Sequence, residues 1–386
     1  MKILHTSDWH VGRTIRGHSR AEEHEAVLAE IASIATDEAV DLILVVGDVF
    51  DSAAPTADAE RVAYRGLLGL AGVGVPIIVL SGNHDNAKRL QAVAPVLEMG
   101  RIVTRATFAD AASGGVVSGT TRDGEPWRVA CVPFLSQRWV VRAADLLGED
   151  ADASVHRGSY AARVARLIDV LTAGFTPDAV NVVAAHLHVD GGLLGGGERA
   201  AHTIFEYAVS PVAFPATAHY VALGHLHRAQ AVPGPAPMRY AGSPLQLDFG
   251  EVNDTKSVTV VTATPGRPAS AQEIPLSTGR RLRTVAGTLA ELGAVEPGED
   301  WLKVIVREPA RSGLADEVRA TFPLAVDVVV EPPDRGASPT GGGAARAGRT
   351  PHELFESYLA DHGIEDPRLG ATFDRLLDAV FEEEPA

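Results

Sequence analysis

The chain has a single cysteine, no long hydrophobic run and no secretory signal. Cys131 is the only cysteine in 386 residues, which excludes an internal disulfide framework and fits a reducing compartment. It lies in a strand-like run, which favours a buried core thiol over a reactive one. No apolar run approaches the ~20 residues that span a bilayer, and the amino terminus has no basic region followed by an apolar stretch. We therefore expect a cytoplasmic protein that makes no use of a membrane.

Positive charge is also scarce. The sequence has 34 Lys and Arg against 50 Asp and Glu, a net charge of -16. This balance argues against a wide, sequence-independent grip on nucleic acid. A polyanionic substrate would have to be held by metal ions, by a partner or by local basic patches. Two such patches exist, at residues 13–20 and 88–89, although each is equally well explained as a solvated basic loop.

Five segments of the chain run from an apolar strand into residues of metal-binding types. The central one is an unbroken apolar run that ends at Asp48, which is typical of a strand buried on both faces. Four other segments repeat this pattern, so we expect five strand ends to converge on one site. Their polar residues are Asp8, His10, Asp48, Asn83, His84, His186, His225 and His227.

These side chains indicate a centre for transition-metal ions. Mixed His, Asp and Asn ligands suit Mn²⁺, Fe or Zn²⁺ rather than Ca²⁺, and the absence of cysteine ligands argues against a structural zinc site. Two such ions ~3.5 to 4 Å apart can clamp a phosphodiester and stabilise the attacking and leaving oxygens. Asp48 has two oxygens at the end of a central strand and is our candidate for the bridging ligand. Asn83 would bind through its amide oxygen without adding charge.

Three further residues stand beside the predicted ligands. His84 follows Asn83 directly, so it is a candidate to orient the phosphate or to protonate the leaving oxygen. Asp51 is three residues beyond Asp48 and could orient a ligand, or equally could cap a turn. His188 shares the strand side of His186, but a tight turn would change its direction.

The remaining sequence predicts an α/β protein with appendages. Helices are expected after a capping box at Ser19 to Glu22 and after Thr56. Hairpins are expected between residues 100 and 135, with a Gly- and Ser-rich separator at 113–124. A mobile surface loop is expected at 191–198. Further strands are expected at 238–250 and 257–262. We divide the chain into a catalytic domain (1–275), a small α/β unit (280–332), a flexible linker (333–349) and a helical partner-binding segment (350–386).

The order of the motifs resembles that of the calcineurin-like metallophosphoesterases. These motifs are Asp-x-His, Gly-Asp-Val-Phe-Asp, Gly-Asn-His-Asp, a single His and Gly-His-x-His. The segments 222–230 and 239–249 more narrowly resemble the bacterial SbcD nuclease subunits, relatives of the Mre-type DNA-repair nucleases. The resemblance covers about residues 1 to 260. It implies a β-sandwich flanked by helices, with a small α/β capping domain and C-terminal helices.

The resemblance also implies roles and partners. The metal ligands would be Asp8, His10, Asp48, Asn83, His186, His225 and His227, holding two divalent ions, most often Mn²⁺. His84 would be the catalytic histidine, while the catalytic role of Asp51 is open because some relatives have a histidine there. The family implies a homodimer that binds an SbcC-type coiled-coil ATPase through the C-terminal helices and acts on DNA at the nucleoid.

The implied activity is that of a 3'-5' exonuclease on duplex ends and an endonuclease on hairpins and single strands, in DNA repair, replication and recombination. Two other functions remain open. A phosphoesterase for small substrates, such as a cyclic-nucleotide phosphodiesterase or a phosphatase, would share the whole metal set but would have no evident use for the capping unit and the C-terminal helices. A noncatalytic scaffold is disfavoured by intact ligands at every motif.

Overall fold

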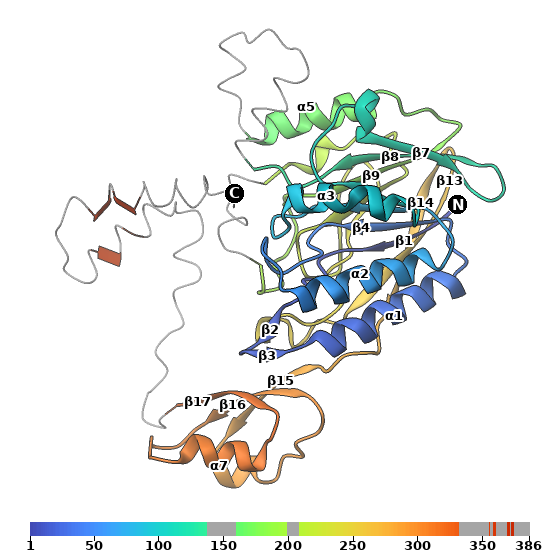
Figure 1. Cartoon of the computed structure of the whole chain (residues 1–386). Helices are drawn as coiled ribbons and strands as arrows, with labels where there is room; N and C mark the ends of the chain where they lie inside the picture. The colour runs from blue at the N-terminus through green and yellow to red at the C-terminus, as the bar shows by residue number, and fades with distance from the viewer. Residues whose placement is uncertain are drawn as a thin grey trace. The chain divides into compact units, whose positions relative to one another are not determined.

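The computed structural model describes residues 1–136, 160–198 and 208–331, together with single residues between 355 and 373. The chain divides into two compact units, Met1–Val330 and Glu331–Ala386. The first unit contains two six-stranded sheets and one three-stranded sheet (Figure 1). Whether its last part forms a separate capping domain, with the boundaries given above, stays a prediction.

The first large sheet has the strand order β14-β13-β1-β4-β5-β6. Strands β1, β4, β5 and β6 are parallel, whereas β13 is antiparallel to both of its neighbours. The strands are β1 (Lys2–Thr6), β4 (Leu42–Val46), β5 (Ile77–Leu80), β6 (Ile102–Arg105), β13 (Ser257–Thr264) and β14 (Arg267–Pro275). One helix crosses between each parallel pair, in order α1 (Ala21–Asp37), α2 (Ala57–Ala71) and α3 (Ala87–Glu98). This alternation is the predicted strand-helix-strand arrangement.

The second large sheet has the order β11-β12-β10-β9-β8-β7. Its four inner strands are parallel, and each edge strand is antiparallel to its neighbour. The strands are β7 (Val116–Thr120), β8 (Pro126–Val132), β9 (Val180–His186), β10 (Tyr220–Gly224), β11 (Gln230–Val232) and β12 (Met238–Tyr240). Helix α5 (Tyr160–Thr172) covers the outer face with an apolar stripe that includes Val164, Leu167 and Leu171.

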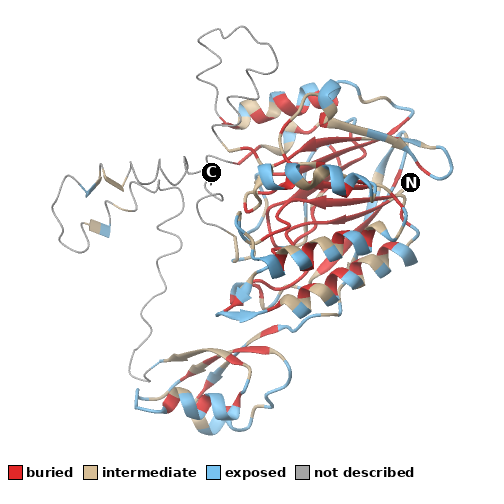
Figure 2. Ribbon diagram, in the orientation of Figure 1, coloured by how far each residue is buried: buried red, intermediate tan, exposed pale blue. Residues whose placement is uncertain are grey.

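The two sheets pack face to face and form the predicted β-sandwich. In β4, Leu42, Leu44 and Val46 belong to the cluster between the sheets, while Ile43 and Val45 belong to the cluster beneath the helices. Successive side chains of a strand point to opposite faces, so a strand with both faces covered needs apolar residues throughout. Figure 2 shows this layer of buried strands between the outer helices. The unbroken apolar run in front of Asp48 thus follows from burial on both sides.

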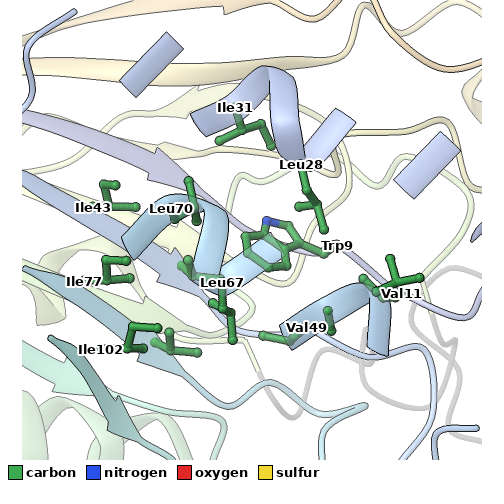
Figure 3. Close-up of a cluster of buried hydrophobic side chains, with 14 of the residues drawn as sticks. Trp9, Val11, Leu28, Ile31, Ile43, Val49, Leu67, Leu70, Ile77 and Ile102 are labelled. Atoms are coloured by element: carbon green, nitrogen blue, oxygen red, sulfur yellow. The ribbon is translucent and has the colours of Figure 1, made fainter. Parts of the chain in front are cut away.

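Trp9 anchors the loop after β1 in the core beneath the helices. Its side chain is fully buried and lies close to Leu28 of α1 and Leu67 of α2 (Figure 3). Its indole nitrogen donates a hydrogen bond to the hydroxyl of Thr6 at 3.0 Å. Because Trp9 stands between Asp8 and His10, its burial fixes the backbone that carries both of those side chains.

The three-stranded sheet has the order β15-β16-β17, and all its strands are parallel. Its strands are β15 (Leu282–Gly287), β16 (Trp301–Val306) and β17 (Ala325–Val330). Two helices lie between them in the chain, α6 (Leu289–Leu292) after β15 and α7 (Leu314–Thr321) after β16. A small apolar cluster joins Leu282 and Trp301 of this sheet to Phe249 and to Ile15. Ile15 belongs to the hairpin of β2 (Thr14–Ile15) and β3 (His18–Ser19), which follows the first motif. The indole of Trp301 also donates a hydrogen bond to Glu23 of α1 at 2.8 Å.

Several local predictions were wrong. Helix α1 begins after Arg20, which makes no side-chain cap, so the predicted capping box at Ser19 does not form. Helix α3 was not predicted because Pro95 lies within it, although Asn86 caps its first turn. The Gly- and Ser-rich stretch at 113–124 contains strand β7 rather than only separating strands. Of the strand expected at 238–250, only Met238–Tyr240 forms.

The second unit is described at only a few residues. The ring of Phe355 stacks on that of Phe373 with centroids 4.2 Å apart. The sequence predicts one apolar helical face in this unit, formed by Phe373, Leu376, Leu377, Val380 and Phe381. The last four of these residues lie outside the described residues, as does the predicted linker. Within the part of the chain that the structure describes, none of the helices has the length and apolar character needed to cross a membrane.

Candidate metal centre

The predicted site residues lie at one edge of the sandwich. Asp8 and His10 follow β1, Asp48 follows β4, Asn83 and His84 follow β5, His186 ends β9, and His225 and His227 follow β10. Strands β1, β4 and β5 are parallel to one another, and so are β9 and β10. The carboxyl ends of parallel strands meet at one edge of a sheet, so each sheet delivers its polar residues as a group.

The carboxylates and imidazoles come together in three overlapping groups. Their possible ligand atoms lie within 4.8 Å of one another in each of these sets: Asp8, His10 and His227; His10, Asp48 and His84; Asp8, Asp48 and His186. All are buried. Asp48 belongs to two of the groups, and its Oδ2 lies 3.5 Å from Nε2 of both His10 and His186. This position between two imidazoles is the one expected of a bridging ligand.

Asn83 connects the two sheets at the centre. Its side-chain oxygen lies 3.0 Å from Nε2 of His186 and 2.8 Å from Nδ1 of His225. The rings of His186 and His225 are 5.3 Å apart and meet edge to face. The amide oxygen, the two imidazoles and the nearby Asp48 therefore form a second group of donors beside that of Asp8, His10 and His227.

Four of the predicted ligands have a left-handed backbone. The φ angles are 53° at Asp8, 47° at His10, 49° at Asp48 and 108° at His225. Non-glycine residues rarely adopt such angles, which cost of order 1–3 kcal/mol each and persist where the surrounding structure enforces them. Backbone hydrogen bonds do so here, since the amide of His10 donates to the carbonyl of Asp48 at 3.0 Å. Strain is thus concentrated at the candidate site.

Glycines let the strand ends approach closely. A Cβ on Gly47 would lie 2.1 Å from Nδ1 of His186, and one on Gly82 would lie 2.0 Å from Oδ1 of Asp48. Either position therefore excludes a side chain. Gly47 directly precedes Asp48 and Gly82 directly precedes Asn83, so the motif letters Gly-Asp and Gly-Asn reflect the close packing of these loops against neighbouring site residues.

His84 and Asp51 flank the group. Nδ1 of His84 lies 2.8 Å from the backbone oxygen of Asp51, so it donates and turns Nε2 to the other side of the ring. The ring of His84 meets that of His10 edge to face at 4.5 Å. The Asp51 carboxylate lies 3.4 Å from Nδ1 of His10 and 3.3 Å from the guanidinium of Arg13. Asp51 therefore contacts a predicted ligand instead of the centre itself.

The sequence of the chain matches a known family over this part. Residues 1–229 match the family model described as calcineurin-like phosphoesterase. Three relatives are named as the SbcD component of the nuclease SbcCD. The one from Bacillus subtilis (strain 168) is 37% identical over 321 residues, covering 80% of this chain and 79% of that protein. The one from Rhodobacter capsulatus is 37% identical and covers 72% and 69%, and the one from Escherichia coli (strain K12) is 30% identical and covers 80% and 76%.

The chain belongs to the SbcD family of calcineurin-like phosphoesterases. It is therefore a metal-dependent phosphodiesterase, and the predictions of family, fold class and enzyme type are confirmed. Membership does not assign roles to individual residues of this SbcD chain, which rest on the geometry above and remain proposals.

The donor set of this SbcD chain fits divalent ions. The nitrogen Nε2 of His10 is buried and has no hydrogen-bond partner within the described residues. An unsatisfied buried polar atom costs about 1–3 kcal/mol, which a bound cation would offset. The carboxylate, imidazole and amide donors, with no thiolate among them, suit ions such as Mn²⁺, Fe²⁺ or Zn²⁺. The residues therefore fit a metal, which Asp8, His10, Asp48, Asn83, His186, His225 and His227 would hold.

Charge is strongly redistributed within the centre. Burial raises the pKa of Asp8 to about 6. Burial would also raise the pKa of Asp48, but the neighbouring His186 and His84 hold it well below its usual value. Burial would lower the pKa of His186, yet the adjacent Asp48 raises it to about 9. Asp48 therefore carries its negative charge at neutral pH, as a bridging ligand must.

His188 lies at the margin of the centre. Its ring is 6.3 Å from that of His225, and it is absent from the three groups of possible ligands. Its Nδ1 is buried without a hydrogen-bond partner among the described residues, and burial lowers its pKa. The geometry supports a place for His188 outside the set of ligands.

Two residues that support the centre were not predicted, and the sequence left a third, Asp85, open between a supporting and a solvated role. The carboxylate of Asp85 accepts backbone hydrogen bonds from Val49 and Phe50, so it supports the centre. Glu251 and Lys256, which contact His227, were not among the candidates. Asp85 could have been found from its place in the Gly-Asn-His-Asp motif. Glu251 and Lys256 lie in a stretch with no regular pattern, so the sequence offered no signal for their contact.

The glycine-rich loop at 191–198 is at the surface, as predicted, but its end reaches the centre. Oε1 of Glu198 accepts hydrogen bonds from the backbone of Gly195 at 2.7 Å and of His227 at 3.1 Å. A Cβ on Gly197 would lie 2.8 Å from Nδ1 of His227. Glycine is therefore needed here for close approach.

Proposed function

We propose that this chain is the DNA nuclease subunit of an SbcCD-type complex, with two divalent ions, Mn²⁺ for preference, at the centre described above. The observation that carries the proposal is the meeting of Asp48 with donor groups from both sheets: His10 lies on one side of it and His186 on the other. One ion would lie among Asp8, His10, Asp48 and His227, and the other among Asp48, Asn83, His186 and His225. When bound, such a pair stabilises the charge that develops on a phosphodiester during hydrolysis.

His84 would assist the leaving oxygen. Its Nδ1–H donates to the carbonyl of Asp51, which fixes the tautomer and directs Nε2 away from that loop. An imidazole with a fixed tautomer beside a bound phosphate can orient the phosphate or supply a proton. Asp51 would act through its neighbours, since its carboxylate contacts His10 and its carbonyl contacts His84.

The activities proposed are 3'-5' exonuclease cleavage of duplex ends and endonuclease cleavage of hairpins and single strands, in DNA repair, replication and recombination at the nucleoid. The relatives named as SbcD components of the nuclease SbcCD support this assignment. A net charge of -16 makes a strong grip on DNA by this chain alone unfavourable. We infer that an SbcC-type ATPase supplies much of that grip.

We further propose a homodimer that binds the coiled coil of the ATPase through residues 350–386. The apolar stripe that the sequence predicts for this segment supports the idea, because two short helices of the predicted kind, after a Pro- and Gly-rich linker, could not bury such a stripe alone. Deletion of the residues beyond 333 should abolish copurification with the ATPase and leave the nuclease centre intact. A stable complex with the deleted chain would contradict this attachment.

The nuclease proposal is tested by cleavage of an end-labelled duplex and a closed hairpin in Mn²⁺, with and without an SbcC-type partner and ATP. His84→Ala should abolish cleavage but retain Mn²⁺ binding, whereas Asp48→Ala should lose both, because Asp48 lies between the two groups of donors. A substitution of the surface residue Asp123 is the control. Intact DNA in every reaction, together with hydrolysis of a small phosphodiester, would favour a small-substrate phosphoesterase.

A further inference from the structure

The ring of His227 is held by a buried carboxylate. Its Nδ1 lies 3.1 Å from Oε1 of Glu251, and the side chains of both residues are almost fully buried. Glu251 ends the short helical turn η6 (Phe249–Glu251), which follows the loop after β12. Because Nδ1 is engaged with Glu251, Nε2 is the ring nitrogen left to face Asp8 and His10, with which His227 forms one of the three groups.

Lys256 completes this arrangement. Its ammonium group donates hydrogen bonds to Oε2 of Glu251 at 2.7 Å, to the hydroxyl of Ser243 at 2.9 Å and to the backbone oxygen of His227 at 3.0 Å. An ammonium group has three donors, so all of them are used. Glu251 and Lys256 therefore hold His227 at its ring and at its backbone.

The turn that carries Glu251 is itself fixed. Oε2 of Glu251 accepts a hydrogen bond from the backbone of Leu247 at 3.0 Å, and its backbone oxygen accepts one from the amide of Gln246 at 2.9 Å. The side-chain oxygen of Gln246 in turn accepts the backbone N–H of Leu282 at 2.6 Å. The carboxylate is thus held rigidly by contacts on both of its oxygens.

We propose that Glu251 and Lys256 are positioning residues for the metal subsite formed by Asp8, His10 and His227. This role rests on the two-ion centre proposed above. A carboxylate that accepts the N–H of an imidazole fixes the tautomer and the ring plane, and it makes the opposite nitrogen a stronger ligand. Lys256 compensates the buried charge of Glu251, without which an isolated carboxylate would be costly to bury. The hydrogen bonds described above join neither residue to the second group around Asn83.

The test measures Mn²⁺ binding to the full chain by calorimetry, without DNA. Glu251→Gln can place its amide N–H₂ against Nδ1 of His227 and loses the charge that pairs with Lys256. We expect one of the two Mn²⁺ affinities to fall about 10- to 100-fold, and the other to stay within about threefold. Lys256→Met should weaken the binding of the same Mn²⁺ ion. Lys256→Arg should keep more of that affinity than Lys256→Met does, because the positive charge is retained.

The matched control is Glu38→Gln, because Glu38 also pairs with a lysine, Lys2 at 2.9 Å, but both of these side chains are partly exposed. It should leave both Mn²⁺ affinities unchanged, and thermal unfolding followed by circular dichroism identifies any variant that fails to fold. The positioning proposal would be overturned if Glu251→Gln lowered both Mn²⁺ affinities equally or lowered neither. In that case, Mn²⁺ binding and DNA cleavage by the wild-type chain would leave the nuclease proposal standing. A wild-type chain that binds no Mn²⁺ and cleaves no DNA would overturn both.

Discussion

The carboxylate of Asp85 lies 2.9 Å from the backbone nitrogen of Phe50. It also accepts the backbone N–H groups of Gly82 at 2.9 Å and Val49 at 3.2 Å. One side chain therefore joins the loop after β4 to the loop after β5, and these two loops carry three of the residues assigned to the centre. All three partners are donors, so a group with two acceptor oxygens is needed at this position.

Asp85→Asn should lower the Mn²⁺ affinity of the centre although Asp85 is not one of the proposed metal ligands. The amide replaces one acceptor with a donor that faces a backbone N–H, which should lower the free energy of unfolding by about 1–3 kcal/mol. Displacement of the two loops should reduce Mn²⁺ affinity about 10- to 100-fold, as measured by calorimetric titration. Asp123→Asn, at an exposed turn, is the control. Wild-type affinity in Asp85→Asn would show that the loops hold their positions without this side chain.

Gly47→Ala and Gly74→Ala form a matched pair. Their φ angles are 83° and 82°, so an added Cβ costs ~1–2 kcal/mol of backbone strain at either position. A Cβ on Gly74 meets nothing within 4 Å, whereas one on Gly47 would lie 2.1 Å from the ring of His186. Both variants should lose stability in denaturant titrations, but only Gly47→Ala should also lose Mn²⁺ binding and cleavage. Similar metal affinities in the two variants would contradict the close approach of the loop to His186.

His5 should make the protein sensitive to acid. Burial between the sheets lowers its pKa to about 3, and its Nδ1 lies 3.0 Å from the hydroxyl of Tyr220. The neutral imidazole is therefore favoured in the folded state, relative to an unfolded pKa near 6.5. The contribution of neutral His5 to the free energy of unfolding is fully present above pH 6.5. It is lost as the pH falls towards 3, and the total loss reaches up to roughly 5 kcal/mol.

His5→Phe should therefore flatten the acid side of the stability curve. Denaturant unfolding of both chains between pH 3 and 8 should give a difference in unfolding free energy that moves in favour of the variant as the pH falls below about 6.5. The hydroxyl of Tyr220 loses its partner at every pH, which gives the variant a constant deficit of about 1 kcal/mol. Parallel curves for the two chains would contradict burial of a neutral His5.

Cys131 should report on global unfolding. It is fully buried in β8, and burial raises its pKa to about 12, so the native thiol is neither accessible nor ionised. A thiol reagent should leave the native chain unmodified over the time in which it completely labels the chain in denaturant. Rapid labelling of native protein would show that the strand opens locally. Since the chain has one cysteine, a single rate describes the experiment.

The sequence predicted those parts of the fold whose burial is visible along the chain. Strand β4 was predicted from its unbroken apolar run, which reflects the cover on both of its faces, and the ligand Asp48 comes two residues after its end. Helix α3 was missed because Pro95 normally ends a helix, and strand β14 is largely exposed and shows no apolar alternation. Local pattern indicates burial but not the partner strand, so the order of the strands within the two sheets required the structure.

The candidate site divides in the same way. The eight strand-end residues were predicted because each follows an apolar run and has a side chain that binds metals. Glu251 and Lys256 act on those residues through contacts between loops, and such contacts leave no spacing in the sequence, whereas Asp85 stands within the Gly-Asn-His-Asp motif. The left-handed backbone of Asp8 and Asp48 was equally invisible, since residue type alone does not predict that angle outside glycine.

The division of the centre between two sheets also orders its assembly during synthesis. The first sheet supplies Asp8, Asp48 and Asn83 early in the chain, but His186 and His227 belong to the second sheet and leave the ribosome much later. A nascent amino-terminal half therefore has only part of the donor set, and in it Asp48 has His10 beside it but not His186. Domains fold as units during synthesis, so we expect the complete donor set only after the strands of both sheets have been made, including β13 of the first sheet, which follows the second sheet in the chain.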